Sequence, residues 1–226
     1  MKEGERNQPE EQTAERQPEK LQYYAKDSIT MGPRVFAEPG EINERSLDGY
    51  EKELGLDIKE LSGKDVLNLG AGATLAFEKS LQEGGIDARV VSLSPDYSNT
   101  DHRKRVLEDK PEVSQIASGV GQQLPFKNES FDYVLALHVT EHLKTKEAYE
   151  AMLREIVRVL RVNGKGYIAP VHDQYFPEVN PNVIPDVQFV REKGLGFIKI
   201  YPFSPSDRPY RLPLERIIVT KTIPRK

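Results

Sequence analysis

The sequence predicts an α/β fold, a doubly wound, mostly parallel seven-stranded sheet in a three-layer sandwich. From residue 63 onward, short apolar runs alternate with segments of helical periodicity, which is typical of parallel strands joined by crossover helices. The apolar runs are bounded by Gly, Ser or Pro, as buried strands often are. A Pro-rich loop without a helix joins the last two predicted strands, so we expect these two to pair antiparallel.

The residues that precede this region divide into a tail and a mixed segment. Residues 1–20 contain no Leu, Ile, Val or aromatic residue, so they cannot bury enough apolar surface to offset the entropy of ordering. We interpret them as a solvated, disordered tail, with partner binding as the alternative. Within the mixed segment 21–62, a helix is expected over 46–58, with Ser46 as its N-cap.

The first half of the α/β region follows from short local patterns. We predict strand, helix, strand, helix and strand at 65–69, 75–81, 88–93, 100–108 and 113–117. The first strand is an apolar run between Gly63 and Gly70. The first helix is ended by the glycine pair at 84–85, and Ser94-Pro95 stops the second strand.

The second half contains the clearest helix in the chain. We predict strand, helix, strand, helix, strand and strand at 131–137, 145–160, 166–170, 184–193, 197–203 and 215–222. In the helix over 145–160, Met152, Ile156 and Val159 recur at helical spacing, which indicates one apolar face. Asn163-Gly164 follows as a typical signal for the end of a helix.

Composition excludes several classes of function. The 226 residues suffice for one domain with a sizeable core, and 36 acidic against 32 basic side chains leave a net charge of −4. Such a protein has no global field that attracts phosphate backbones, so nucleic-acid binding is not expected. The absence of cysteine excludes disulfides, thiolate nucleophiles and Cys-based metal sites. No apolar run has the length of a membrane span or the form of a signal peptide, so we expect a cytoplasmic protein without a membrane partner.

A glycine pair follows the first predicted strand, in Asn68-Leu-Gly70-Ala-Gly72. Glycines at this place let the backbone turn tightly and approach a ligand closely. The third glycine of a dinucleotide fingerprint would fall at Leu75, which argues against an NAD-type phosphate site.

Further short motifs follow this loop in a fixed order: Leu124-Pro125-Phe126, Ser130-Phe131-Asp132, Glu141-His142, and Arg158-Val159-Leu160 with Gly164. With them, residues 63 to about 171 resemble the class I S-adenosylmethionine-dependent methyltransferases, especially the type 11 group. The resemblance implies a Rossmann-like methyltransferase fold for residues 63–226. It also implies an N-terminal helical cover in residues 21–62, and leaves open whether this cover closes over the cofactor.

The positions that depart from the family are those that contact the cofactor. Asn68, Ser92 and Val120 stand where the family has acids that meet the methionyl end, the ribose hydroxyls and the adenine amino group, and Thr74 replaces a glycine. Losing two hydrogen bonds to charged acceptors weakens binding by roughly 10²–10⁴-fold. The sequence is therefore compatible with weak binding of S-adenosyl-L-methionine, and not with a standard pocket.

The residues that the resemblance implies in cofactor binding follow the predicted strands. They are Asn68, Gly70, Ala71, Gly72, Ser92, Leu93, Asp96, Gln122 and His138. Asn68, Ser92 and Gln122 offer neutral hydrogen-bonding groups, and the carboxylate of Asp96 is placed to reach back to the ribose.

Two histidines that follow predicted strands are candidate catalytic residues. His138 or His172 would act as general base toward an acceptor hydroxyl or amine, because the ordinary pKa of histidine is about 6.5. The alternative is that His138 only lines the pocket. His138-Val-Thr-Glu141-His142 also matches the pattern of inverted zinc peptidases. That segment begins at the end of a strand and no third ligand motif follows, so we predict no metal site.

Two functions are thus compatible with the sequence. The first is an S-adenosylmethionine-dependent methyltransferase that acts on an unidentified acceptor, either a small molecule or a protein. The second is a non-catalytic protein of the same fold, with a degraded cofactor pocket, that serves as a binding or regulatory partner. The residues identify neither the acceptor nor the oligomeric state.

Overall fold

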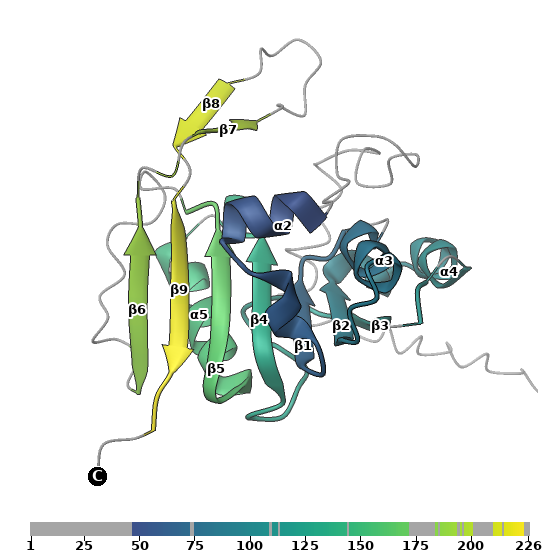
Figure 1. The fold of residues 1–226 in the computed structure, drawn as a ribbon, viewed down its shortest axis with the longest axis horizontal. Coiled ribbons are helices and arrows are strands. Elements are labelled where there is room, and N and C mark those ends of the chain that lie inside the picture. Colours follow the sequence, from purple (N-terminus) through teal and green to yellow (C-terminus); the bar gives the residue numbers. More distant parts are fainter. Residues whose placement is uncertain are drawn as a thin grey trace, which may run out of the picture.

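The computed structural model describes residues 47–72, 75–108, 110–112, 114–143, 145–171, 184, 186–193, 195, 197–200, 210–213 and 215–223. Within them one large sheet carries helices on both faces, which is the predicted three-layer arrangement (Figure 1). None of the helices in these ranges is long and apolar enough to cross a membrane.

The large sheet has seven strands in the order β3-β2-β1-β4-β5-β9-β6. They are β1 (Asp65–Leu69), β2 (Arg89–Ser94), β3 (Ser114–Ser118), β4 (Phe131–Leu137), β5 (Leu160–Ala169), β6 (Val187–Glu192) and β9 (Arg216–Lys221). The pairs among β1 to β5 are parallel, whereas β9 pairs antiparallel with both β5 and β6. The predicted doubly wound, mostly parallel seven-stranded sheet is therefore confirmed.

Two details at the C-terminal edge of the sheet were predicted wrongly. The expected helix over 184–193 is the strand β6, where half-buried residues alternate with exposed ones from Val187 to Val190, the period of a strand and not of a helix. The expected pairing of 197–203 with 215–222 is not formed. Instead β7 (Phe197–Ile200) pairs with β8 (Tyr210–Pro213) in a separate two-stranded sheet, and β9 inserts between β5 and β6.

The helices are α2 (Leu47–Leu54), α3 (Ala76–Glu83), α4 (Thr100–Glu108) and α5 (Lys146–Val159), with short 3₁₀ turns η2 (Ile58–Leu61), η3 (Pro95–Ser98) and η4 (Thr140–His142). Helix α5 confirms the clearest sequence prediction, and the Thr145 side chain caps it by accepting from the Ala148 backbone N–H. Helix α2 is shorter than predicted, and its expected cap Ser46 lies outside the described residues.

Helix α5 stops at Val159, one residue before its predicted end, and β5 begins at once, so the prediction that Asn163-Gly164 terminates the helix is wrong. Asn163 and Gly164 lie instead within β5, beside a register shift between Phe131 and Tyr133 of β4. A Cβ at Gly164 would lie 3.0 Å from the Asp132 carbonyl oxygen, so the close approach of the two strands requires glycine there.

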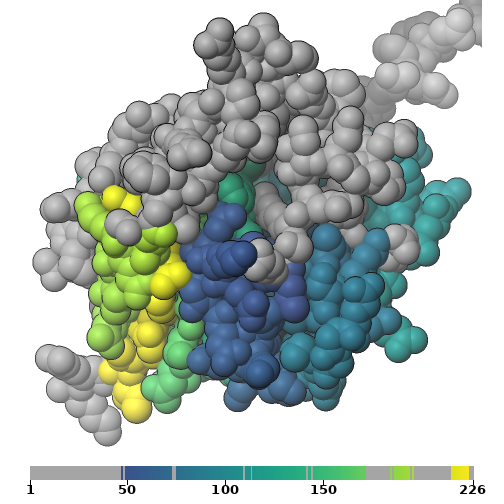
Figure 2. Space-filling view, turned by 45° about the horizontal axis from the view of Figure 1, so that its top comes forward, coloured from purple at the N-terminus to yellow at the C-terminus, as the bar shows by residue number. Residues whose placement is uncertain are grey.

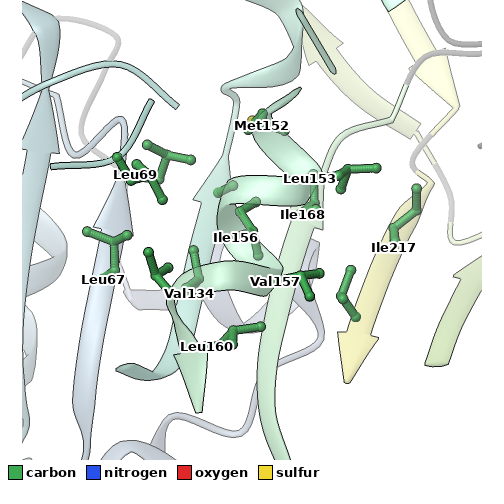
Figure 3. Close-up of a cluster of buried hydrophobic side chains, with 14 of the residues drawn as sticks. Leu67, Leu69, Val134, Met152, Leu153, Ile156, Val157, Leu160, Ile168 and Ile217 are labelled. Atoms are coloured by element: carbon green, nitrogen blue, oxygen red, sulfur yellow. The ribbon is translucent and has the colours of Figure 1, made fainter. Parts of the chain in front are cut away.

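Each face of the sheet buries its own apolar cluster. Helix α5 covers one face, where Met152, Leu153 and Ile156 pack on side chains of β1, β4, β5 and β9 (Figure 3). Helices α2 and α3 cover the other, where Tyr50 stacks on Phe77 with ring centroids 3.9 Å apart. Residues 47–61, which precede β1, therefore share a core with the sheet.

Candidate functional site

The strand order of the sheet reverses between β1 and β4. The chain passes from β1 outward to β2 and β3, and then returns to place β4 on the opposite side of β1 (Figure 1). Open α/β sheets bind ligands in the crevice outside the carboxyl ends of the strands at such a switch point. Eight of the nine residues predicted to bind the cofactor lie either at the carboxyl ends of β1 and β2 or in the loops that follow β1, β2 and β4. The structure therefore gathers these positions at one edge of the sheet.

The loop after β1 depends on its glycines. Gly70 and Gly72 both have φ of +75°, a left-handed conformation that favours glycine. A Cβ at Gly70 would lie 2.8 Å from Cγ2 of Val139, so the loops after β1 and β4 are in contact. Among the residues that the structure describes, nothing lies within 4 Å of a Cβ built at Gly72. Within that part of the chain, the backbone at Gly72 is therefore open to close approach by a ligand.

Hydrogen bonds fix this glycine loop to the end of β2. The backbone N–H groups of Gly70 and Ala71 both donate to the Leu93 carbonyl oxygen, at 2.8 and 3.2 Å. The Tyr97 hydroxyl, on the turn after β2, donates to the Gly72 carbonyl oxygen at 2.7 Å. Asp96 lies half-buried in the same turn, where its backbone N–H donates to Ser94 Oγ. Hydrogen bonds thus connect the predicted residues that follow β1 with those at the end of β2.

The side chains of Asn68 and Ser92, by contrast, are buried away from solvent and share one hydrogen-bond partner. Both side chains are fully buried and both donate at 2.6 Å to Glu78 Oε1, on α3. The Tyr50 hydroxyl donates to Asn68 Oδ1 at 2.8 Å, and Ser92 Oγ lies 2.9 Å from Ser114 Oγ. Sequence reasoning missed Glu78. Its signal was an acid on the buried face of α3, adjacent to Phe77 and three residues before Leu81.

The loop that carries Gln122 is held by α5. Arg158 donates to the carbonyl oxygens of Leu124 and Phe126 at 3.0 and 2.7 Å, and Glu155 accepts from the Leu124 backbone N–H. The hydrogen bond from Arg158 lowers the pKa of the Glu155 carboxyl below its usual range. The Leu-Pro-Phe and Arg-Val-Leu motifs therefore belong to one clamp, which positions the loop.

His138 directly follows β4 and has a left-handed conformation, with φ of +57°. Its backbone N–H donates to the Ala169 carbonyl oxygen at 2.7 Å, and its Nε2 lies 2.9 Å from Glu53 Oε2. Glu53 is on α2, three residues after Tyr50, so one helix brings both side chains to this edge. Sequence reasoning missed Glu53. The second predicted histidine, His172, lies outside the described residues.

The segment from His138 to His142 does not form one helix. His138 is left-handed and the 3₁₀ turn η4 begins only at Thr140, so the two histidines do not share the face of an α-helix. Across the residues that the structure describes, no group of three or more His, Asp or Glu side chains is placed to hold a metal ion.

Comparisons with known proteins agree with the fold. Residues 67–168 match a family model described as "Methyltransferase domain". The chain is 28% identical over 161 residues to the uncharacterized methyltransferase YcgJ of Bacillus subtilis, a match that spans 64% of this chain and 58% of the relative.

Solved structures show the same fold. The crystal structure of YcgJ from Bacillus subtilis superposes with a TM-score of 0.54 at 16% identity, over 76% of this chain and 98% of that one. The N-methyltransferase NodS from Bradyrhizobium japonicum gives a TM-score of 0.52 at 14% identity, over 79% and 96% of the two chains. Residues 67–168 of this chain thus match a methyltransferase domain, and the chain has the fold of the class I methyltransferases.

Proposed function

We propose that the protein is an S-adenosylmethionine-dependent methyltransferase whose acceptor loses a proton as it is methylated. The observation that carries this proposal is the switch point of the sheet within the matched region, where the glycine loop, the β2 turn and the His138–Glu53 pair lie at one sheet edge. When bound, the cofactor would supply a methyl group activated by its sulfonium sulfur.

Several residues fit such a cofactor. The left-handed Gly72 presents backbone that no Cβ shields, which suits close packing against the methionyl part of the ligand. Asp96 provides a half-buried carboxylate for the ribose hydroxyls, and Gln122 on the clamped loop provides an amide for the adenine region. Asn68 and Ser92 support the strand ends from within, since their side chains bond Glu78.

His138 is the proposed proton acceptor. Because Nε2 lies 2.9 Å from Glu53 Oε2, we assign the ring proton of the neutral imidazole to Nε2, which leaves Nδ1 as its basic nitrogen. The proton that an acceptor hydroxyl or amine loses would move to Nδ1, and the carboxylate of Glu53 would stabilise the resulting imidazolium. Glu53 thus acts as a positioning residue for His138.

Calorimetric titration of the full chain with S-adenosylmethionine and S-adenosylhomocysteine tests the cofactor. Micromolar binding of either ligand is expected. Absence of binding at millimolar ligand would overturn the proposal and leave the non-catalytic role of the fold.

Transfer of labelled methyl groups to panels of hydroxyl, amine and carboxyl compounds and to proteins then tests activity. On an acceptor found in this way, His138→Asn is expected to lower kcat by about 10²–10⁴-fold, the usual contribution of a general base. Glu53→Gln should lower kcat less and shift the pH profile. Glu60→Gln is the matched control, because Glu60 bonds Tyr133 and Lys165 near the opposite end of the strands. Unchanged kcat in His138→Asn would remove the assigned base.

A further inference from the structure

Five fully buried polar side chains connect five elements on the α2–α3 face of the sheet. They are Tyr50 on α2, Asn68 on β1, Glu78 on α3, Ser92 on β2 and Ser114 on β3. We call this set the Glu78 network. Buried polar groups are retained at a desolvation penalty, so a network of this size inside an otherwise apolar layer needs a reason.

The hydrogen bonds of the network converge on one oxygen atom. Asn68 Nδ2 and Ser92 Oγ both donate to Glu78 Oε1 at 2.6 Å. Asn68 Oδ1 in turn accepts a hydrogen bond from the Tyr50 hydroxyl. Because the Ser92 hydroxyl donates its proton to Glu78, the Ser114 hydroxyl is the donor in the bond between the two serines. Two donors on one oxygen need no proton from the carboxyl group, so this arrangement is compatible with an ionised Glu78.

The network lies directly beneath the proposed cofactor crevice. Asn68 stands two residues before Gly70, and Ser92 precedes Leu93, whose carbonyl oxygen holds the glycine loop. Asn68 and Ser92 are paired across β1 and β2, and Glu78 binds both. These are two of the positions at which the sequence lacks the acids that its resemblance leads one to expect. The chain has thus one carboxylate between the two strand ends, supplied by α3.

We propose that Glu78 is a positioning residue for the cofactor and acts through Asn68 and Ser92. From α3, the Glu78 side chain provides the negative charge that favours a cationic ligand over a neutral one. This inference rests on the proposed function. A charge inside protein is weakly screened, and over about 10 Å it changes the affinity for an opposite charge by about tenfold. S-Adenosylmethionine carries a sulfonium cation, whereas S-adenosylhomocysteine has a neutral thioether. The charge of Glu78 therefore acts on the first ligand more than on the second.

The test is Glu78→Gln, titrated with both ligands by calorimetry. This near-isosteric change removes the charge and keeps a side chain that can bond both partners. Affinity for S-adenosylmethionine should fall by about tenfold and affinity for S-adenosylhomocysteine by less, so the ratio of the two affinities falls. A purely structural role would weaken both ligands alike. The control Glu60→Gln should leave the ratio unchanged.

The double variant Glu78→Gln/Ser92→Asp keeps one carboxylate in the hydrogen-bonded pair of residues 78 and 92, but places it on β2 instead of α3. It should recover the wild-type affinity ratio, and it carries the test if the single variant does not fold. A folded double variant without that recovery, or a single variant with the wild-type ratio, would overturn the role of Glu78. Wild-type protein that binds neither ligand would instead refute the proposed function itself.

Discussion

The two faces of the sheet are built on different principles, and β1 displays the contrast in adjacent residues. Leu67 points to the α5 face, into a cluster of buried hydrophobic side chains (Figure 3). Asn68 points to the α2–α3 face, where it bonds Tyr50 and Glu78. The first face stabilises the fold by apolar burial. The second combines apolar burial with a polar network that joins the ends of β1 and β2 to α2 and α3, below the proposed cofactor site.

The largest effect is expected from placing a polar residue on the apolar face. Leu67→Asn removes the burial of a leucine and leaves an amide without designed partners, which should lower the free energy of unfolding by about 3–6 kcal/mol. Urea denaturation measures the change. Leu67→Met, similar in volume, is the control and should lose less than about 1.5 kcal/mol. Equal losses in the two variants would show that polarity is not what this face excludes.

The reverse exchange tests the polar face. Asn68→Leu keeps the volume but takes a hydrogen-bond partner from both Tyr50 and Glu78, so we expect a loss of about 2–4 kcal/mol in the free energy of unfolding. Combination with Tyr50→Phe should give a loss smaller than the sum of the single variants, since the two side chains share a bond. Strict additivity would contradict the network.

Tyr50→Phe alone should have a smaller effect. It deletes only the hydroxyl that donates to Asn68 and keeps the ring stacked on Phe77, so a loss of about 1–2 kcal/mol is expected. Thermal and urea denaturation both measure it. A variant as stable as the wild type would place the Tyr50 hydroxyl outside the network.

The smallest effect is expected at Asp65, which lies at the solvent-facing start of β1. Arg89, joined by Arg161, holds the pKa of Asp65 below its usual range. A depressed folded-state pKa adds stability above the ordinary pKa of about 3.9, and this stability is lost as the pH falls through the folded-state value. Asp65→Asn should therefore be less stable than the wild type at pH 7, by at most about 1 kcal/mol. Denaturation as a function of pH should show the two proteins converging in acid. A gap that widens in acid would reverse the assigned sign.

The parallel part of the sheet was predictable because its signals are local. Runs such as Phe131–Leu137 and the helical spacing of Met152 and Ile156 specify element type without knowledge of neighbours. The C-terminal edge was not predictable in this way, because β6 is an edge strand whose pairing with β9 decides its conformation. The short path from α5 into β5 was missed since the Asn163-Gly164 signal also suits a bulge.

The residues of the candidate site also differ in how far local sequence signals predict them. The glycine loop and His138 could be predicted as site residues because strand ends and turn residues can be read along the chain. Glu53 and Glu78 were not identified, since each acquires its partner from a different element and helix periodicity alone treats both as ordinary helical acids. The assignment of these residues to cofactor and proton chemistry stays a prediction until the titrations are done.

The position of α2 affects how the protein should be cut for experiments. The methyltransferase match spans residues 67–168, whereas α2 ends at Leu54 and β9 begins at Arg216. A Cβ at Gly55, where α2 has just ended, would collide with the Arg216 guanidinium, so the two outlying segments touch each other. A fragment trimmed to the match would lose Tyr50 and Glu53, and would expose β5 as an unpaired edge open to aggregation. The shortest useful expression fragment therefore starts before α2 and extends through β9.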